Sequence, residues 1–308
     1  MDWIERWTQE DRGRFRTGIV RARHRLADSG LFCDPALEEL IETHPRELLD
    51  IAVMDEDGSS RSWTDMAPGA RGGAELLEGA RQGRVWMNLR QAFNIHPEYR
   101  ALLGAVFAEL RALHPRFRPD VIKGGLLISA PGARVPFHID RTDTMLWHLR
   151  GKKRVYVYPR SAPVLNEADV EAVLMHPFSD DLPYRSEFDR RARVFDLEPG
   201  EVLCWPVHTP HRVVNLDGLN VSMATEYACA DVRVRNHAMM FNGLMRRRFG
   251  LTPSIDESRG LGLAARAGLG LAARKLKLLP KPDAPAPEAA PGGEPLISAM
   301  GEAGHSGA

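Results

Sequence analysis

The sequence has few cysteines, no net charge and no long apolar run. Its 308 residues include three cysteines, Cys33, Cys204 and Cys229, and no C-x-x-C pair. An odd number of widely spaced cysteines offers neither a disulfide framework nor a cysteine-based zinc site. The pattern indicates a reducing compartment, so we expect a cytoplasmic protein.

The charges balance, with 41 basic and 41 acidic residues. A neutral chain has no overall field that would attract nucleic acid or an anionic membrane, although a local patch is not excluded. The N-terminus is charged within its first five residues and lacks the apolar segment of a signal peptide. No later stretch approaches the about 20 apolar residues of a membrane span. We therefore expect no nucleic-acid partner and no membrane span.

The composition that remains is that of an ordinary globular protein. Hydrophobic residues make up 44% of the chain and charged residues 27%, which excludes collagen-like and wholly disordered classes. The length suffices for one large domain with appendages, or for two modest domains, and for a sizeable core.

The first part of the chain, residues 1–117, has a mainly helical pattern and is expected to pack on the domain that follows. Apolar residues recur at threes and fours, and this spacing predicts helices near residues 10–29, 36–44, 73–82 and 97–113. Asp34 followed by Pro35 fits an N-cap with proline at the first helical position.

In residues 118–232 the sequence pattern changes from helical to short runs rich in β-forming residues, which glycine and proline separate. Several such strands predict a sandwich or barrel. A polar insert at residues 162–191, with a helix predicted at 167–175, interrupts them, and long insertions of this kind often carry function. Residues 233–279 return to helix, including a glycine-rich repeat from Gly260 that is a weak helix former. Residues 280–308 are rich in proline, alanine and glycine, and we expect them to be disordered.

The sharpest chemical signal is the triplet His138-Ile139-Asp140. Side chains alternate faces along a strand, so the imidazole and the carboxylate project the same way. By itself H-x-D is weak, because it occurs by chance and strand histidines are more often packed or on the surface. The segment WPVHTPHRVVN supplies a third ligand from His208 or His211, and the spacing to the following apolar strand favours His211.

Two histidines and one carboxylate form the facial triad of non-haem Fe(II) oxygenases. Three protein ligands on one face of an octahedron leave three positions, two for a bidentate 2-oxo acid and one for dioxygen. A fourth protein ligand would close the site.

With these residues in place, the sequence resembles the cupin-like, JmjC-type hydroxylases between about residues 126 and 227. The matching stretches are SAPGARVPFHID, LWHLRGKKRVYVYP and DLEPGEVLCWPVHTPHRVVNLDGLNVSMATE. The resemblance implies an α+β fold with a double-stranded β-helix, or cupin barrel, between N-terminal and C-terminal helical flanks. It also implies that His138, Asp140 and His211 bind Fe(II).

The resemblance assigns 2-oxoglutarate to a second group of residues. Lys153 lies thirteen residues after Asp140 in a G-x-K-R turn, where the asparaginyl-hydroxylase branch of the family pairs a lysine with the distal carboxylate of the cosubstrate. Thr144, Asn220 and Ser222 are weaker candidates for contacts to it. His148 stands where the family often has glutamine. Three roles stay open for it: a hydrogen bond to a metal ligand, a contact to the substrate, or packing in the core.

The sequence thus predicts an oxygenase that uses Fe(II), 2-oxoglutarate and dioxygen to hydroxylate an organic substrate. A protein or peptide side chain is favoured over a small metabolite by the resemblance alone. Two alternatives stay open, because cupins host many activities: a metal-dependent cupin enzyme without 2-oxoglutarate, and a non-catalytic binding or regulatory protein. A homodimer formed through the helical flanks is also expected by analogy.

Overall fold

The computed structural model describes residues 2–5, 7–54, 63–65, 71–83, 85–175, 182–255 and 260–279. The tail expected to be disordered, residues 280–308, lies outside the described residues, as does part of the polar insert. Within the described part, no helix is both long enough and apolar enough to cross a membrane.

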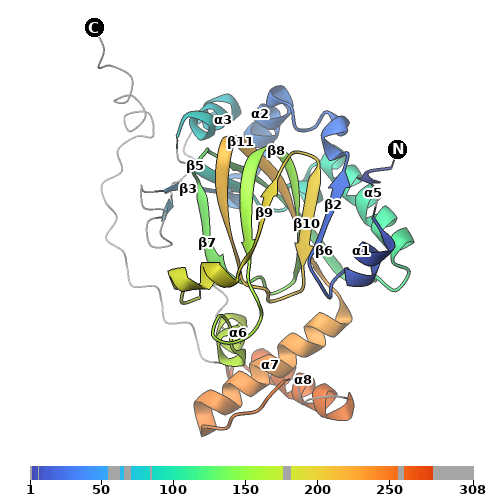
Figure 1. Ribbon diagram of the computed structural model, residues 1–308, viewed down its shortest axis with the longest axis vertical. Coiled ribbons are helices and arrows are strands. Elements are labelled where there is room, and N and C mark those ends of the chain that lie inside the picture. The colour runs from blue at the N-terminus through green and yellow to red at the C-terminus, as the bar shows by residue number, and fades with distance from the viewer. Residues whose placement is uncertain are drawn as a thin grey trace.

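The described strands, from Ile4 to Ala228, form one antiparallel sheet (Figure 1). Its main path has the strand order β1-β2-β10-β8-β11-β6-β5-β3-β4, with β7 paired to β11 and β9 paired to β8. The strands are β1 (Ile4–Glu5), β2 (Val20–His24), β3 (Leu49–Met54), β4 (Trp63–Asp65), β5 (Val85–Leu89), β6 (Val121–Ser129), β7 (Arg134–His138), β8 (Asp143–Val157), β9 (Arg193–Leu197), β10 (Glu201–Trp205) and β11 (His211–Ala228).

A long antiparallel ribbon of β8 and β11 folds this sheet into a barrel. The ribbon runs from the pair Asp143 and Tyr227 to the pair Val157 and His211, and its register shifts midway. Gly151 lies at that point with a φ of 78°, and a Cβ there would lie 2.8 Å from the Leu219 carbonyl oxygen. Only glycine fits this corner.

The two halves of the ribbon have different neighbours. The half that contains Asp143 pairs with β10 and β6, and the half that contains Val157 pairs with β9 and β7. Side chains from both halves share one buried cluster, which is Leu146, Val155, Val157, Leu197, Leu203, Trp205 and Val213. The halves therefore face each other, and the predicted α+β double-stranded β-helix is confirmed.

Helices lie along the outside of the barrel and at both of its ends (Figure 1). They are α1 (Gln9–Arg14), α2 (Asp34–Thr43), α3 (Gly73–Gln82), α4 (Ala92–Ile95), α5 (Pro97–Leu113), α6 (Glu167–Met175), α7 (Ala230–Phe249) and α8 (Gly260–Lys275). Four predicted helices are confirmed as α2, α3, α5 and α6. Figure 1 places α6, α7 and α8 together at one end of the barrel, with α2 and α3 at the other.

The predicted helix at residues 10–29 is wrong. A short helix ends at Arg14, and β2 follows with alternating buried and exposed residues. The alternation in VRARH is a period-two signal, and β2 pairs with β10. The barrel edge at β10 thereby gains a hydrogen-bonding partner, which outweighs the helical propensity of this segment.

The first 117 residues are less helical than the sequence predicts, because they also contribute β1 to β5 to the sheet. β5 pairs with β6 at the opposite edge from β2. These strands form one sheet with the barrel. The domain division at residue 117, like those at 232 and 279, stays a prediction, because shared strand pairing does not mark where a folding unit ends.

Candidate metal centre

Three side chains converge at the mouth of the barrel, the end that α6, α7 and α8 cover. His138 is the last residue of β7, Asp140 follows two positions later, and His211 is the first residue of β11. The two histidines are register partners across the pair of strands. One ligand atom from each of the three residues lies within 4.8 Å of the others. The structure therefore brings together the three residues that the sequence singled out as metal ligands.

Backbone hydrogen bonds fix the orientation of both imidazoles. His138 Nδ1 lies 2.8 Å from the Pro136 carbonyl oxygen, and His211 Nδ1 lies 3.0 Å from the Thr209 carbonyl oxygen. A carbonyl can only accept, so each Nδ1 carries the proton and each Nε2 presents a lone pair. Both Nε2 atoms face Asp140, at 3.8 Å from Oδ1 and 3.6 Å from Oδ2. These separations exceed hydrogen-bonding distance and suit an ion held between the groups.

Burial keeps His211 in the neutral form that a metal requires. Its side chain is 5% exposed, and its ring packs against Trp205 with centroids 4.4 Å apart. Burial, and next the nearby His138, lower the pKa of His211 to about 4. Asp140 Oδ2 is buried without a hydrogen-bond partner among the described residues. Two imidazole Nε2 atoms that present lone pairs and one carboxylate with an unsatisfied oxygen form a donor set that fits Fe(II).

Lys153 is a buried cation on the second half of β8, opposite Asn215. Its relative exposure is 3%. Burial alone lowers its pKa to about 7, and the described residues supply no carboxylate beside it. A buried ammonium without an opposite charge is costly. The residue therefore fits the binding of an anion from outside the chain, such as the distal carboxylate of 2-oxoglutarate.

Thr144 and Ser222 lie on the ribbon, and Asn220 lies at its corner. The Thr144 hydroxyl is buried without a hydrogen-bond partner in the described structure, and Thr144 is the register partner of Trp205, whose ring contacts His211. Thr144 therefore fits a polar contact near the metal. Asn220 Nδ2 donates to the carbonyl oxygens of Asp217 and Gly218, at 3.0 Å each, so that amide group is used by the turn.

His148 lies apart from the metal cluster. Its Nδ1 lies 3.1 Å from Ser222 Oγ, and its Nε2 lies 2.9 Å from the Gly151 carbonyl oxygen. Burial, and next the charge of Lys153, lower its pKa to about 3. Because both ring nitrogens already have partners, His148 ties the corner of the ribbon together and offers no ligand atom.

His208 also lies outside the cluster of three ligands, although it precedes His211 by only three residues. It lines a separate cavity of about 360 Å³ together with Arg160, Arg235 and parts of α6. Of the two histidines that the sequence offers as the third ligand, His211 is the one that lies with His138 and Asp140.

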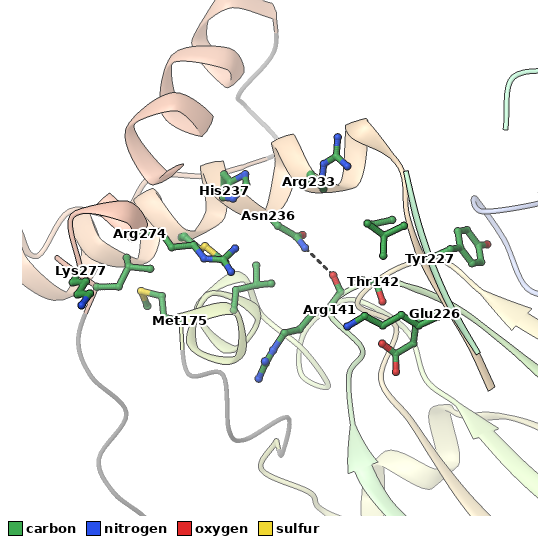
Figure 2. Close-up of a pocket in the computed structure, with 16 residues that line it drawn as sticks. Arg141, Thr142, Met175, Glu226, Tyr227, Arg233, Asn236, His237, Arg274 and Lys277 are labelled. Carbon is green, nitrogen blue, oxygen red and sulfur yellow. Dashed lines mark hydrogen bonds between the residues drawn. The ribbon is translucent and has the colours of Figure 1, made fainter. Parts of the chain in front are cut away.

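A larger cavity of about 590 Å³ opens beside the same end of the barrel, between the strand ends and the helices α7 and α8. Figure 2 shows Arg141 and Thr142, which directly follow Asp140, next to Asn236 of α7. Asn236 Nδ2 donates to the Arg141 carbonyl oxygen at 2.7 Å. Five basic residues line this cavity: Lys123, Arg141, Arg233, Arg274 and Lys277. Sequence reasoning missed both cavities, because no local pattern links α7 to the H-x-D loop.

The comparisons with known proteins agree with this architecture. The model of a family described as a cupin-like domain matches residues 76–227. The X-ray structure of Escherichia coli YcfD is 18% identical, with a TM-score of 0.51 and coverage of 92% of this chain and 70% of that one. A second structure of YcfD is described as a ribosomal oxygenase from Escherichia coli in complex with cobalt and 2-oxoglutarate. It is 17% identical, with a TM-score of 0.51 and coverage of 92% of this chain and 69% of that one. At this identity the likeness shows a shared fold. No curated protein sequence matches the chain.

Proposed function

We propose that this chain, of which residues 76–227 match the model of a cupin-like domain family, is a JmjC-type oxygenase that depends on Fe(II) and 2-oxoglutarate. The observation that carries the proposal is the convergence of His138 Nε2, His211 Nε2 and the Asp140 carboxylate on one point. The YcfD structure that contains cobalt and 2-oxoglutarate supports it through the shared fold.

The proposal gives each residue a defined role. His138, Asp140 and His211 hold Fe(II), and Lys153 pairs with the distal carboxylate of 2-oxoglutarate. When bound, the iron supplies the oxidation chemistry: dioxygen and 2-oxoglutarate become succinate and carbon dioxide while a C–H bond of the substrate becomes C–OH. The backbone carbonyls at Pro136 and Thr209 keep both imidazoles in the required tautomer.

The remaining candidates shape the cosubstrate site. Thr144 offers its hydroxyl near the metal, and Ser222 holds His148 in place beside Lys153. Asn220 acts through the corner of the ribbon, where its amide fixes the turn. A dry barrel interior strengthens the pairing of Lys153 with a carboxylate, because charges interact more strongly away from water.

The substrate that we propose is a protein or peptide side chain rather than a small metabolite. Two observations support this choice: the structural neighbour is described as a ribosomal oxygenase, and a cavity of about 590 Å³ opens beside the H-x-D loop. A cytoplasmic location and the absence of a nucleic-acid partner remain part of the same proposal.

The proposal is tested by adding Fe(II) and 2-oxoglutarate to the purified protein without oxygen and recording the visible spectrum. We expect the charge-transfer band of an Fe(II) chelate with a 2-oxo acid. His138→Ala and Asp140→Ala should abolish it, because each removes a ligand. Lys153→Ala should weaken 2-oxoglutarate binding by about tenfold or more, as expected for the loss of a charge-assisted contact, and leave iron binding unchanged.

His208→Ala is the control for the choice of ligand, since His208 lies outside the cluster. It should keep both iron and the band. Iron binding without the band would instead favour the metal-dependent cupin enzyme that uses no 2-oxoglutarate. Protein that binds neither iron nor 2-oxoglutarate would favour the non-catalytic alternative.

A further inference from the structure

The loop that carries Asp140 is the part of the metal centre that the sheet supports least. His138 ends one strand and His211 begins another, and the two are register partners. Asp140, by contrast, lies between the end of β7 at His138 and the start of β8 at Asp143. Its Oδ2 has no hydrogen-bond partner among the described residues. Contacts from outside the sheet are therefore needed to fix the direction of this carboxylate.

A side chain of α7 holds the backbone of this loop. Asn236 Nδ2 donates a hydrogen bond of 2.7 Å to the carbonyl oxygen of Arg141, which Figure 2 shows as a dashed line. A carbonyl can only accept, so the amide must turn its nitrogen toward the loop. Arg141 directly follows Asp140 in the chain. The hydrogen bond thus acts on the backbone one residue beyond the proposed metal ligand.

Two further contacts join α7 to the same loop. Ile139, which separates the two ligands of the H-x-D triplet, is fully buried in one cluster with apolar residues of α6 and α7. At the far end of the loop, Arg16 Nη2 lies 3.1 Å from Asp143 Oδ2 and 2.9 Å from Asp231 Oδ1. This bridge joins the start of β8 to the first turn of α7. The helix therefore contacts the loop along its whole length.

The three contacts differ in what they can specify. Apolar packing is non-directional, so the burial of Ile139 keeps the loop against the helices without orienting a side chain. The bridge through Arg16 acts at Asp143, beyond the loop. A hydrogen bond has a preferred length and angle, and the one from Asn236 acts next to Asp140. The Asn236 amide also interacts with His208, which lies outside the cluster of metal ligands.

We propose that Asn236 is a positioning residue of the metal centre: it holds the loop after β7 so that the Asp140 carboxylate faces the Nε2 atoms of His138 and His211. In this arrangement α7 is a working part of the site and not only its cover. The inference rests on the proposed function where it names the metal. The order of the loop in the metal-free chain does not depend on that function.

The first measurement is metal affinity, with Co(II) as the probe added to the metal-free full chain and followed by its visible absorption. Asn236→Leu has a side chain of similar size without a donor. It should weaken Co(II) binding about tenfold, as expected for the loss of a group that orients a ligand. If Asn236→Leu fails to fold by circular dichroism, Asn236→Ala takes its place.

The second measurement is the order of the loop backbone, from ¹⁵N relaxation of the metal-free full chain. The amides of Arg141 and Thr142 should have order parameters near about 0.85 in the wild type, and below about 0.6 in Asn236→Leu. A role confined to overall stability would not produce a loss of order restricted to these residues.

Two control variants separate this role from other effects. Asn242→Leu makes the same substitution on the same helix, at a buried residue that faces Arg266 of α8. His208→Ala removes the other residue with which the Asn236 amide interacts. Both variants should keep the Co(II) affinity and the loop order of the wild type.

Equal loop order in the wild type and Asn236→Leu would overturn the proposal. Weaker Co(II) binding with unchanged order would also overturn it, since Asn236 would then not act through the loop. An equal loss of affinity in Asn242→Leu or His208→Ala would have the same consequence. A wild type that binds no Co(II), but whose loop loses order in Asn236→Leu, would refute the metal centre and support the hold of Asn236 on the loop. The two proposals can therefore fail separately.

Discussion

Lys153 illustrates how one buried residue can be unfavourable for stability and useful for binding. Its ammonium group is buried and has no carboxylate beside it among the described residues. An unpaired neutral donor costs about 1–3 kcal/mol of stability, and a charged group such as this one costs more. An incoming dicarboxylate would offset that cost, so part of the binding energy comes from relieving an unfavourable native state.

This arrangement predicts an unusual pH dependence for the metal-free, ligand-free protein. The pKa of Lys153 is lowered to about 7 in the folded state, against about 10.4 in an unfolded chain. Between these values the unfolded state binds more protons, so stability should rise with pH from about 7 to about 10. Urea denaturation across this range measures the slope.

Lys153→Met should remove this contribution and stabilise the ligand-free protein at pH 7 by about 1 kcal/mol or more. Lys152→Met is the control, because Lys152 is exposed and pairs with Glu198 at 2.8 Å. If both variants show the slope of the wild type, the proposed burial of a charged Lys153 is incorrect.

At the scale of elements, the packing of α8 against α7 depends on one glycine of the repeat. A Cβ at Gly270 would lie 1.8 Å from the His237 carbonyl oxygen, and a Cβ at Gly268 would meet nothing within 4 Å. The repeat therefore uses glycine for two different reasons. At position 270 it allows close contact between helices, whereas at position 268 it only weakens the helix.

Gly270→Ala should destabilise the docking of α8 by about 1–3 kcal/mol, because backbone atoms must move to admit the methyl group. Gly268→Ala should instead stabilise the helix by about 0.5–1 kcal/mol. Thermal denaturation and limited proteolysis of α8 measure both. Equal effects of the two substitutions would show that α8 does not pack on α7 through Gly270.

At the scale of the molecule, three leucines of the C-terminal region expose apolar surface that a second protein chain could cover. Leu261 is 90% exposed, Leu269 52% and Leu276 69%. Their spacings of eight and seven residues place them on one side of a helical path. We propose that this surface pairs with a second copy of the chain, in keeping with the homodimer that the sequence suggests by analogy.

Light scattering should therefore give twice the mass of one chain, 34.3 kDa. The double substitution Leu261→Ser and Leu269→Ser should reduce it to a monomer, because it removes apolar area from the centre of the surface. Leu216→Ser, at an exposed leucine of β11, should leave the mass unchanged. A wild-type chain that is monomeric at all concentrations would reject the dimer.

The sequence by itself determined the features that depend on neighbouring residues. Helices α2, α3 and α5 follow from local apolar periodicity. The predicted N-cap at Asp34 is wrong by one residue, because α2 begins at Asp34 and its N-cap is Cys33, without a side-chain cap hydrogen bond. The spacing of His138 and Asp140 is also read from the sequence, but β7 ends at His138, so the loop that follows the strand, and not strand alternation, directs Asp140 toward the histidines. The spacing to Lys153 and the preference for His211 over His208 also came from the sequence, through the resemblance and the strand that follows.

Only the tertiary structure decided which distant segments meet. A strand cannot specify its neighbour through local propensity, so the sequence predicts a helix at residues 10–29 where the structure has β2 paired with β10. The same reason hid the partners of His148 and the cavity shared by Arg160, His208 and Arg235. Contacts between residues far apart in the chain are set by how the barrel closes and how α7 covers its mouth, and no local pattern encodes that.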